Sequence, residues 1–368
     1  MSPSALELVE ADCVSVLTPE VVARLEPLRG EHIVITGGTG FVGTWLAEIL
    51  ARLNDGSGFG ARVTLTGCRT KPFRARVPHL ASRADIDVVE QDIRDTVELP
   101  EDTPWVIHAA GSPDSRLHAS DPVRTLQTFV HGTDALLRAA SRVEPLRKIL
   151  FLSSGLVYGP QPLDVERLGE RVRGACDFGT VESAYIEAKR AAETLCAAYR
   201  SEHRLPTVVA RPFAFIGPYQ ALSAPWAVNN FLQDGLHGGP VRILGNGETT
   251  RSYMYPSDMA VWMLTLALHG RPGGEYNVGS ERGVTLRELA SAVAEECGRT
   301  VEVVEGGPGR RPTSASRFVP DTRIARNDLG LVETVDLGTA IARTVAWHRA
   351  SSAAATPRDR APDRTRSQ

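Results

Sequence analysis

Short apolar runs alternate with longer amphipathic stretches from about residue 31 onward. Strands separated by helices in this way are typical of a parallel sheet that is covered by helices on both faces. The chain therefore predicts an α/β fold built on a doubly wound parallel sheet. We expect its strands at 32–35, 62–66, 87–90, 105–109, 148–153 and 207–210, and its helices at 44–53, 122–140 and 184–201.

The regular alternation ends near residue 212, and turns rich in glycine and proline divide the following stretch into short segments. We expect a smaller C-terminal α/β lobe over 213–348, interleaved with the larger domain over 30–212. Residues 1–29 form an N-terminal extension with a weak helical pattern. Residues 349–368 are mostly small and charged, and we expect them to form a disordered tail.

Charge and cysteine content narrow the class of protein. The formal net charge is -3, which gives no basic surplus for nucleic-acid binding. The five cysteines are scattered without a CxxC pair, which favours a reducing compartment and argues against a metal site. No apolar run reaches the ~20 residues of a membrane span, and the N-terminus lacks a signal-peptide pattern. We therefore expect a cytoplasmic protein with no nucleic-acid partner, no membrane partner and no metal.

A glycine-rich turn follows the first predicted strand. Gly37, Gly40 and Gly43 have the spacing GxxGxxG and lead directly into a predicted helix. Glycine permits the tight turn and lets the backbone approach a pyrophosphate closely. The start of the helix, at Phe41 and Val42, offers backbone N–H groups to phosphate oxygens. This context predicts a Rossmann-type dinucleotide-binding domain.

The second predicted strand ends at Gly67, where an acidic residue usually binds the adenosine ribose. Because no carboxylate at this position would repel a 2′-phosphate, and because Arg69 follows closely, the sequence favours NADP over NAD. The alternative for Arg69 is a solvated surface side chain. Further candidate cofactor contacts follow later strands, and each is equally compatible with an ordinary turn. They are Asp92, Ile93, Ala109, Ala110 and Gly111.

Tyr185 and Lys189 are four residues apart, so they share one face of a predicted helix. A nearby ammonium group lowers the pKa of a phenol and makes the phenolate accessible near neutral pH. Ser153 and Ser154 end an apolar strand. A hydroxyl at this position can hydrogen-bond the substrate oxygen that Tyr185 protonates or deprotonates. A strand, a serine and a Tyr-x-x-x-Lys helix downstream of a glycine loop form a specific combination.

With these motifs the chain resembles the extended short-chain dehydrogenases/reductases of the NAD-dependent epimerase/dehydratase family. The resemblance covers about residues 31–348 and is carried, in order, by TGGTGFVG, HAAG, SSGLVYG, YIEAK, RPFAFIGP and GNGETTRSYMYPSD. It implies an enzyme that uses NAD(P) to modify a nucleotide-diphosphate sugar, and a homodimer that pairs through residues 131–140 and 185–199. It places the catalytic roles on Ser154, Tyr185 and Lys189, with Ser153, Tyr185 and Lys189 also at the cofactor.

The resemblance implies that Tyr185 removes a proton from a sugar hydroxyl, usually at C4, while a hydride passes to the nicotinamide. Gly155 and Leu156 stand where 4,6-dehydratases carry Asp-Glu, and decarboxylases place a glutamate where Leu156 stands. Both of these activities are therefore disfavoured. We expect a C4 epimerase with bound NAD. The alternatives are an NADPH-dependent 4-ketoreductase of a keto-deoxy nucleotide sugar and a cofactor-binding protein without turnover.

In the smaller lobe, the resemblance implies that Asn230 and Phe231 lie near the nucleotide and that Arg251 and Arg311 bind the diphosphate. A guanidinium group offers a bidentate fork that suits phosphate oxygens.

The sequence also allows predictions for several other positions. Phe129 and Ala214 stand where the family has asparagines. Asp258 is expected to cap a helix that begins near Met259. The histidines of the cofactor half lack metal-ligand spacing, and we interpret them as structural or surface residues; they are His108, His118 and His131.

Overall fold

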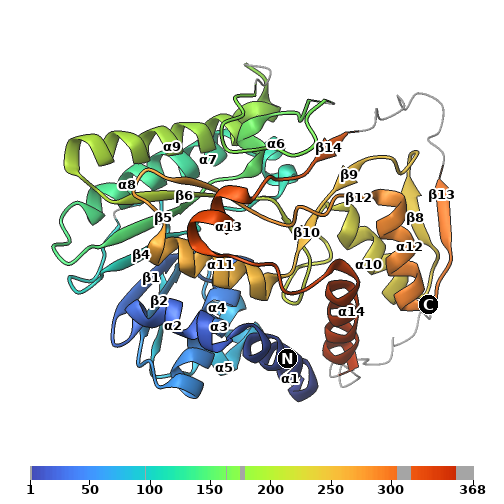
Figure 1. The fold of residues 1–368 in the computed structure, drawn as a ribbon, viewed down its shortest axis with the longest axis horizontal. Coiled ribbons are helices and arrows are strands. Elements are labelled where there is room, and N and C mark those ends of the chain that lie inside the picture. The colour runs from blue at the N-terminus through green and yellow to red at the C-terminus, as the bar shows by residue number, and fades with distance from the viewer. Residues whose placement is uncertain (1, 96, 163, 175–178, 305–315, 354–368) are drawn as a thin grey trace, which may run out of the picture.

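A computed structural model of the chain describes residues 2–95, 97–162, 164–174, 179–304 and 316–353. Within these residues, a parallel sheet of seven strands has the order β11-β6-β5-β4-β1-β2-β3 (Figure 1). Its register pairs Val34 with Val106 and Ile107 with Leu150. The strands are β1 His32–Thr36, β2 Arg62–Gly67, β3 Ile86–Glu90, β4 Trp105–His108, β5 Lys148–Leu152, β6 Thr207–Pro212 and β11 Glu275–Val278.

The sheet confirms the predicted fold class and all six predicted strands. The seventh strand, β11, comes from the C-terminal half of the chain and pairs with β6. A segment from the expected C-terminal lobe therefore completes the central sheet.

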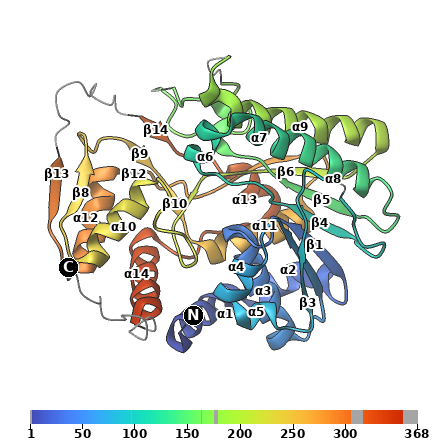
Figure 2. The same ribbon diagram turned by 180° about the vertical axis from the view of Figure 1, so that it is seen from behind.

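Successive side chains of each strand enter two separate hydrophobic layers, because a strand alternates its side chains between faces. Ile149 and Phe151 pack in the layer of α8 (Gly132–Ala140) and α9 (Ala184–His203). Leu150 and Leu152 pack in the opposite layer, with α3 (Phe41–Ser57) and α11 (Pro256–His269). Both views of the ribbon show α9 on one side of the sheet and α3 on the other (Figure 2).

The helix predicted at 122–140 is formed, but it contains a wider turn. It consists of α7 (Pro122–Leu126), a π-helical turn η2 (Gln127–His131) and α8. Single π turns occur mostly inside α-helices and often at functional sites. The turn carries Phe129, whose ring contacts that of Tyr185.

The N-terminal extension is helical and packs against the larger domain. It consists of α1 (Pro3–Val16) and α2 (Pro19–Leu25). Asp12 of α1 accepts a hydrogen bond from the buried phenol of Tyr255 and an ion pair from Arg343, with Nη1 and Oδ1 2.8 Å apart. Arg343 belongs to α14 (Leu337–Ala353), so the extension joins the last helix to the main core.

Between residues 213 and 318, the described part of the chain contains short strand pairs together with the helices α10, α11 and α12. Its parallel pair β8–β13 packs beside α10 and α12, and β9 lies between β12 and β14. The elements are β7 Ala214–Phe215, α10 Ala227–His237, β8 Val241–Leu244, β9 Thr250–Arg251, β10 Tyr253–Met254, β12 Val284–Thr285, α12 Leu286–Cys297, β13 Val301–Val304 and β14 Arg317–Phe318. The remaining elements are η1 Glu26–Leu28, α4 Lys71–Arg76, α5 Pro78–Ala81, α6 Ser115–Ser120, η3 Gly155–Tyr158, η4 Val181–Ser183 and α13 Arg323–Leu329.

Two expectations about local structure need correction. Asp258 does not cap α11, because the helix begins at Pro256 after the N-cap Tyr255. The Asp258 carboxylate instead accepts hydrogen bonds from the backbone N–H groups of Thr334 and Val335, at 2.8 and 3.0 Å, and so anchors a distant loop. Helix α14 continues to Ala353, so the first residues of the expected tail are helical; 354–368 lie outside the described residues.

Candidate active site

The glycine loop lies where the carboxyl ends of β1 and β4 meet. Gly37 has φ +68, and a Cβ added to it would lie 2.5 Å from the backbone oxygen of Ala109. A Cβ on Gly43 would lie 2.3 Å from the Cα of Gly38. Both positions therefore require glycine. Gly40, the N-cap of α3, has no side chain to satisfy the first N–H groups of the helix, beginning at Phe41, so they face the loop as a phosphate cradle.

The end of β2 is shaped by the glycine loop itself. A Cβ on Gly67 would lie 2.3 Å from the hydroxyl oxygen of Thr39, so no acidic side chain fits there without displacing Thr39. Arg69 follows as an exposed side chain. Sequence reasoning missed a second arginine, Arg76 of α4. It donates to the backbone oxygen of Thr39 at 3.1 Å and to the hydroxyl of Thr44 at 2.9 Å, and burial lowers its pKa.

The other predicted cofactor residues lie at the same edge of the sheet. Asp92 forms an ion pair with Arg94, which holds the pKa of its carboxyl at about 2. Ile93 is buried and its side chain occupies the space beside Gly132. Gly111 has φ +124, and a Cβ there would meet the ring of Phe129 at 2.1 Å, so this position also requires glycine. Ala109 and Ala110 line the end of β4 next to Gly37.

The three predicted catalytic residues come together at the carboxyl end of β5. Ser154 follows the strand and its hydroxyl accepts a hydrogen bond from the Leu156 N–H at 3.1 Å. Tyr185 lies in the first turn of α9. Burial raises the pKa of Tyr185, while a hydrogen bond with Ser154 opposes that rise. The sequence therefore predicted correctly that these two side chains meet, although they are 31 positions apart along the chain.

Lys189 lies one helical turn after Tyr185 and is buried. Its Nζ donates to the backbone oxygen of Leu152 at 2.6 Å and lies 4.2 Å from the ring centre of Phe129 and 5.0 Å from that of Phe151. Burial among these aromatic rings lowers the pKa of Lys189 to about 7, although Glu193 acts in the opposite direction. A lysine that is half-charged near neutral pH suits proton transfer.

Ser153 supplies the observation that tests the fit of a cofactor. Its hydroxyl oxygen is buried, and it has no hydrogen-bond partner in the part of the chain that the structure describes. Buried polar atoms are normally satisfied, because an unpaired one costs ~1–3 kcal/mol. An unsatisfied hydroxyl next to Ser154, at the carboxyl end of β5 and on the same edge of the sheet as the glycine cradle, fits a site built for a bound polar molecule. The residues therefore fit a dinucleotide laid across the strand ends.

Two of the three histidines behave as predicted, and one does not. His108 is buried between the hydroxyls of Thr36 and Thr133, and burial lowers its pKa to about 3, so it is a neutral structural residue. His131 is exposed. His118, however, stacks on the ring of Tyr185 at a centroid distance of 4.2 Å, which places it at the site.

The predicted substrate residues lie in different settings. Arg251 of β9 donates to the backbone oxygens of Thr250 and Ser316, at 2.8 and 3.2 Å, and burial lowers its pKa. Asn230 is exposed on α10. Phe231 is only 3% exposed and packs in the main hydrophobic core, which leaves little of its ring for a ligand. Arg311 lies outside the described residues.

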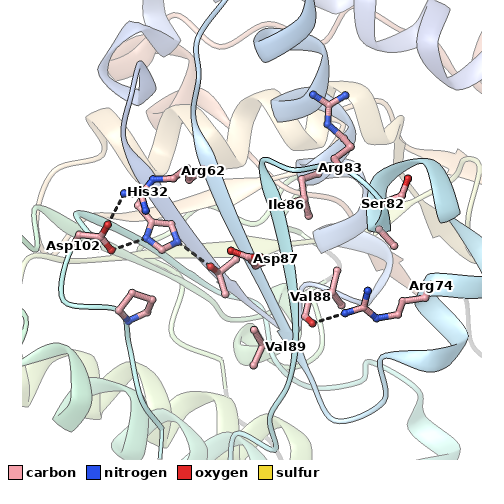
Figure 3. A pocket seen from close by; sticks show the side chains of 13 residues that line it. His32, Arg62, Arg74, Ser82, Arg83, Ile86, Asp87, Val88, Val89 and Asp102 are labelled. Carbon is pink, nitrogen blue, oxygen red and sulfur yellow. Dashed lines mark hydrogen bonds and ion pairs between the residues drawn. The ribbon is translucent and has the colours of Figure 1, made fainter.

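A separate surface groove of about 610 Å³ lies at the opposite end of the sheet. It is lined by the first residues of β1, β2 and β3, and Figure 3 shows Asp102 bonded to both His32 and Arg62 there. The predicted catalytic residues follow the other ends of the strands, so this groove is not the candidate active site. Among the described residues, no cluster of metal-ligating side chains is found, and no helix is long and apolar enough to cross a membrane.

The fold defines a dinucleotide-binding α/β enzyme, in which Ser154, Tyr185 and Lys189 form the candidate centre, and sequence comparison is consistent with this class. Residues 33–279 match the sequence model described as the NAD dependent epimerase/dehydratase family. The chain belongs to this family.

Several curated relatives share most of the chain. A dTDP-glucose 4,6-dehydratase from Streptomyces niveus is 28% identical over 86% of this chain and 93% of its own length. UDP-glucuronic acid decarboxylase 6 from Arabidopsis thaliana is 30% identical over 83% of this chain and 85% of its own length. Among solved structures, a UDP-glucose 4-epimerase from Thermotoga maritima superposes with a TM-score of 0.73 at 24% identity, over 87% of this chain and 99% of that one. At that identity the superposition shows the shared fold.

Proposed function

We propose that this protein is a nucleotide-sugar epimerase that acts at C4 through a transient 4-keto intermediate and uses bound NAD(P). The observation that carries the proposal is the Ser154–Tyr185–Lys189 cluster beside the glycine cradle, without an accompanying acid. The relatives named above are enzymes of UDP- and dTDP-activated sugars, which supports a nucleotide-diphosphate sugar as the substrate.

In this proposal the glycine loop binds the pyrophosphate through the first N–H groups of α3, at Phe41, Val42 and Gly43. Ser153 and Lys189 would hydrogen-bond the ribose at the nicotinamide end. When bound, the nicotinamide supplies a reversible hydride acceptor.

The chain's own residues carry the proton. Tyr185 Oη takes the proton from the C4 hydroxyl and later returns it, while Ser154 holds the same sugar oxygen by a hydrogen bond. The protonated form of Lys189, one helical turn away, would offset part of the burial that raises the pKa of Tyr185. Burial strengthens this electrostatic effect because the local dielectric constant is low.

The two positions that follow Ser154 support the exclusion of water elimination and of decarboxylation. A Cβ on Gly155 would lie 2.8 Å from the ring of Phe213, so an acidic side chain does not fit there. Leu156 is apolar and 44% exposed. Although the relatives named above include a dehydratase and a decarboxylase, this chain lacks a carboxyl group at either position.

A second candidate is an NADPH-dependent 4-ketoreductase of a keto-deoxy nucleotide sugar. The end of β2 favours it, because Gly67 leaves no carboxylate to repel a 2′-phosphate and the exposed Arg69 lies nearby. The same catalytic cluster serves both reactions, since Tyr185 exchanges a proton with the C4 oxygen in each: off and back in the epimerase, and once in the reductase.

The two candidates are separated by the cofactor content of freshly purified, acid-denatured protein. An epimerase regenerates its oxidised cofactor in each cycle, so we expect about one tightly bound NAD per chain. A reductase must exchange its cofactor after every turnover. An empty site, with NADPH consumed only when a 4-keto nucleotide sugar is added, would replace the epimerase with the reductase.

We further propose a homodimer that pairs through the helices at 131–140 and 185–199. Helix α7, which leads into the first of these stretches, carries apolar side chains that are largely exposed in a single chain: Val123 at 64% and Leu126 at 41%. Light scattering after gel filtration should give twice the chain mass of 39.7 kDa. A monomer at micromolar concentration would contradict this part of the proposal.

A further inference from the structure

His118 forms a face-to-face stack with the catalytic phenol. Its ring centre lies 4.2 Å from that of Tyr185, and the two planes differ by only 8°. Phe129 meets Tyr185 edge-on, at 5.2 Å and 81°, and meets His118 at 6.4 Å and 78°. Two aromatic neighbours at right angles to each other therefore hold the phenol ring from two directions.

His118 is also held by contacts within its own helix and with the residues just before it. It lies on the short helix α6, whose N-cap Asp114 accepts a hydrogen bond from the Arg116 N–H at 2.9 Å. Its Nε2 lies 2.7 Å from the backbone oxygen of Ser112. A carbonyl oxygen only accepts, so Nε2 carries the proton. His118 is only 8% exposed, which leaves its ring little freedom to rotate.

The charged and polar groups that face the ring determine its protonation. Burial lowers the pKa of His118, and Lys189 acts in the same direction, while the Ser112 carbonyl and Asp114 act in the opposite direction. The net shift is downward, so the imidazole is neutral near pH 7. Because the rings stack by their faces, neither ring nitrogen points at the phenol oxygen. Proton exchange between His118 and Tyr185 therefore does not explain the contact.

We propose that His118 is the positioning residue of Tyr185: the stacked imidazole fixes the plane of the phenol, so that its oxygen stays aligned with Ser154 and with the sugar hydroxyl. The inference rests on the proposed function for its catalytic consequence, but the constraint on the ring exists without substrate. Proton transfer depends on heavy-atom alignment within hydrogen-bond reach, and a displacement of about 1 Å can cost ~100-fold in rate.

Two variants separate the ring stack from the other properties of histidine. His118→Phe keeps an aromatic face but loses the bond to Ser112, whereas His118→Leu loses the stack. We expect His118→Leu to lower kcat by ~10- to 100-fold, with KM for the nucleotide sugar changed less than about twofold, because the alignment and not the binding is lost. His118→Phe should recover kcat to within about threefold of the wild type. His237→Phe, at an exposed histidine of α10, is the matched control and should leave kcat unchanged.

A readout that needs no turnover is the ring flip of Tyr185, followed by NMR in protein with labelled tyrosine rings and assigned through Tyr185→Phe. The flip should be slow in the wild type and in His118→Phe, and faster in His118→Leu, with the same content of bound nicotinamide in all three. Wild-type kcat and an unchanged flip in His118→Leu would overturn the proposal, and so would a His118→Phe protein as slow as His118→Leu. If the wild type itself converts no nucleotide sugar, the proposed function fails, while the flip rates still decide whether His118 constrains Tyr185.

Discussion

Two buried clusters of this protein each combine a tyrosine with a cation, and they differ in how completely their polar atoms are paired. In the first, Arg211 of β6 forms ion pairs with Glu193 and Glu275, at 2.6 and 3.0 Å, and donates to the phenol oxygen of Tyr158 at 3.0 Å. That phenol in turn donates to the side-chain oxygen of Asn277 at 2.8 Å.

In the second cluster, the pairing is incomplete. Lys189 has one hydrogen bond, to the Leu152 carbonyl, and otherwise faces the rings of Phe129 and Phe151. The hydroxyl of the neighbouring Ser153 has no partner among the described residues.

The electrostatic result differs accordingly. Burial alone would lower the pKa of Arg211, but its bonds with Glu193 raise it above the usual value. Burial lowers the pKa of Lys189 to about 7, because no bonded carboxylate compensates it. The fully paired cluster therefore fixes one charge state and holds the strand ends together. The incompletely paired cluster leaves groups that are ready to exchange a proton or bind a ligand.

The largest expected effect follows from removing one hydroxyl in the incompletely paired cluster. Tyr185→Phe should lower turnover by ~10³-fold or more, because it removes the phenol that hydrogen-bonds Ser154 and is proposed to accept the proton from the sugar. Steady-state kinetics measures this effect, and the melting temperature should stay within a few degrees. The matched control is Tyr158→Phe, which should keep turnover within several-fold and lose ~1–2 kcal/mol of stability through its broken hydrogen bonds. Equal losses of turnover in both variants would remove the distinction between the clusters.

The next effect concerns the pH dependence of stability. Unfolding returns the pKa of Lys189 from about 7 to its ordinary 10.5. Between these values the unfolded chain binds more protons than the folded one, so this lysine makes the protein more stable as pH rises, by at most roughly 4–5 kcal/mol. Denaturant titrations across this range should show that the free energy of unfolding rises more steeply with pH in the wild type than in Lys189→Met. If the free energies of unfolding of the two proteins changed in parallel with pH, the pKa of Lys189 would not be shifted in the folded state.

Breaking the paired cluster should damage stability rather than chemistry. Arg211→Met leaves Glu193 close to the protein interior without its partner, and we expect a loss of ~3 kcal/mol in the free energy of unfolding. The fraction that remains folded should retain its turnover per site. The measurement is a denaturant titration together with kinetics normalised to bound cofactor. A stable protein with impaired kcat would place Arg211 in the reaction instead.

The smallest effect concerns Arg69, a cation that is exposed and belongs to neither cluster. Arg69→Ala should change stability by less than about 0.5 kcal/mol, as is usual for surface positions. If NADP is the cofactor, the variant should weaken its binding relative to NAD by ~10-fold, because a charge-assisted contact with the 2′-phosphate is lost. Calorimetric titration with both cofactors provides the comparison. An unchanged ratio would make Arg69 a solvated surface residue.

The sequence predicted the sheet, the glycine cradle and the Tyr185–Lys189 pair because each depends on short-range spacing, whereas the place of Ser154 beside them followed from the resemblance to the family. Tyr185 and Lys189 share a helix face by their four-residue separation, and Gly37 and Gly43 stand beside strand and helix ends. By contrast, the role of His118 depends on how α6 folds back over α9, and no periodic pattern reports such a contact. The prediction for Asp258 was wrong for the same reason, because its carboxylate binds a loop 76 positions away instead of capping its own helix.

Arg76 and Phe231 show two further limits of spacing arguments. Arg76 reaches the glycine loop only because α4 packs beside it, across 37 positions of sequence. Phe231 sits next to the exposed Asn230, yet a helix turns neighbouring side chains about 100° apart, so one enters the core while the other faces solvent.

The most direct test of the central claim is a rapid-mixing experiment on the protein loaded with one NAD per chain. A panel of UDP- and dTDP-hexoses is added, and the near-ultraviolet absorbance of reduced nicotinamide is followed in the wild type and in Tyr185→Phe. We predict that one sugar nucleotide gives a transient rise in the wild type, which decays as the C4 epimer forms, and that Tyr185→Phe gives neither. An epimer formed by Tyr185→Phe at the wild-type rate, or formed by the wild type without any absorbance change, would contradict the account.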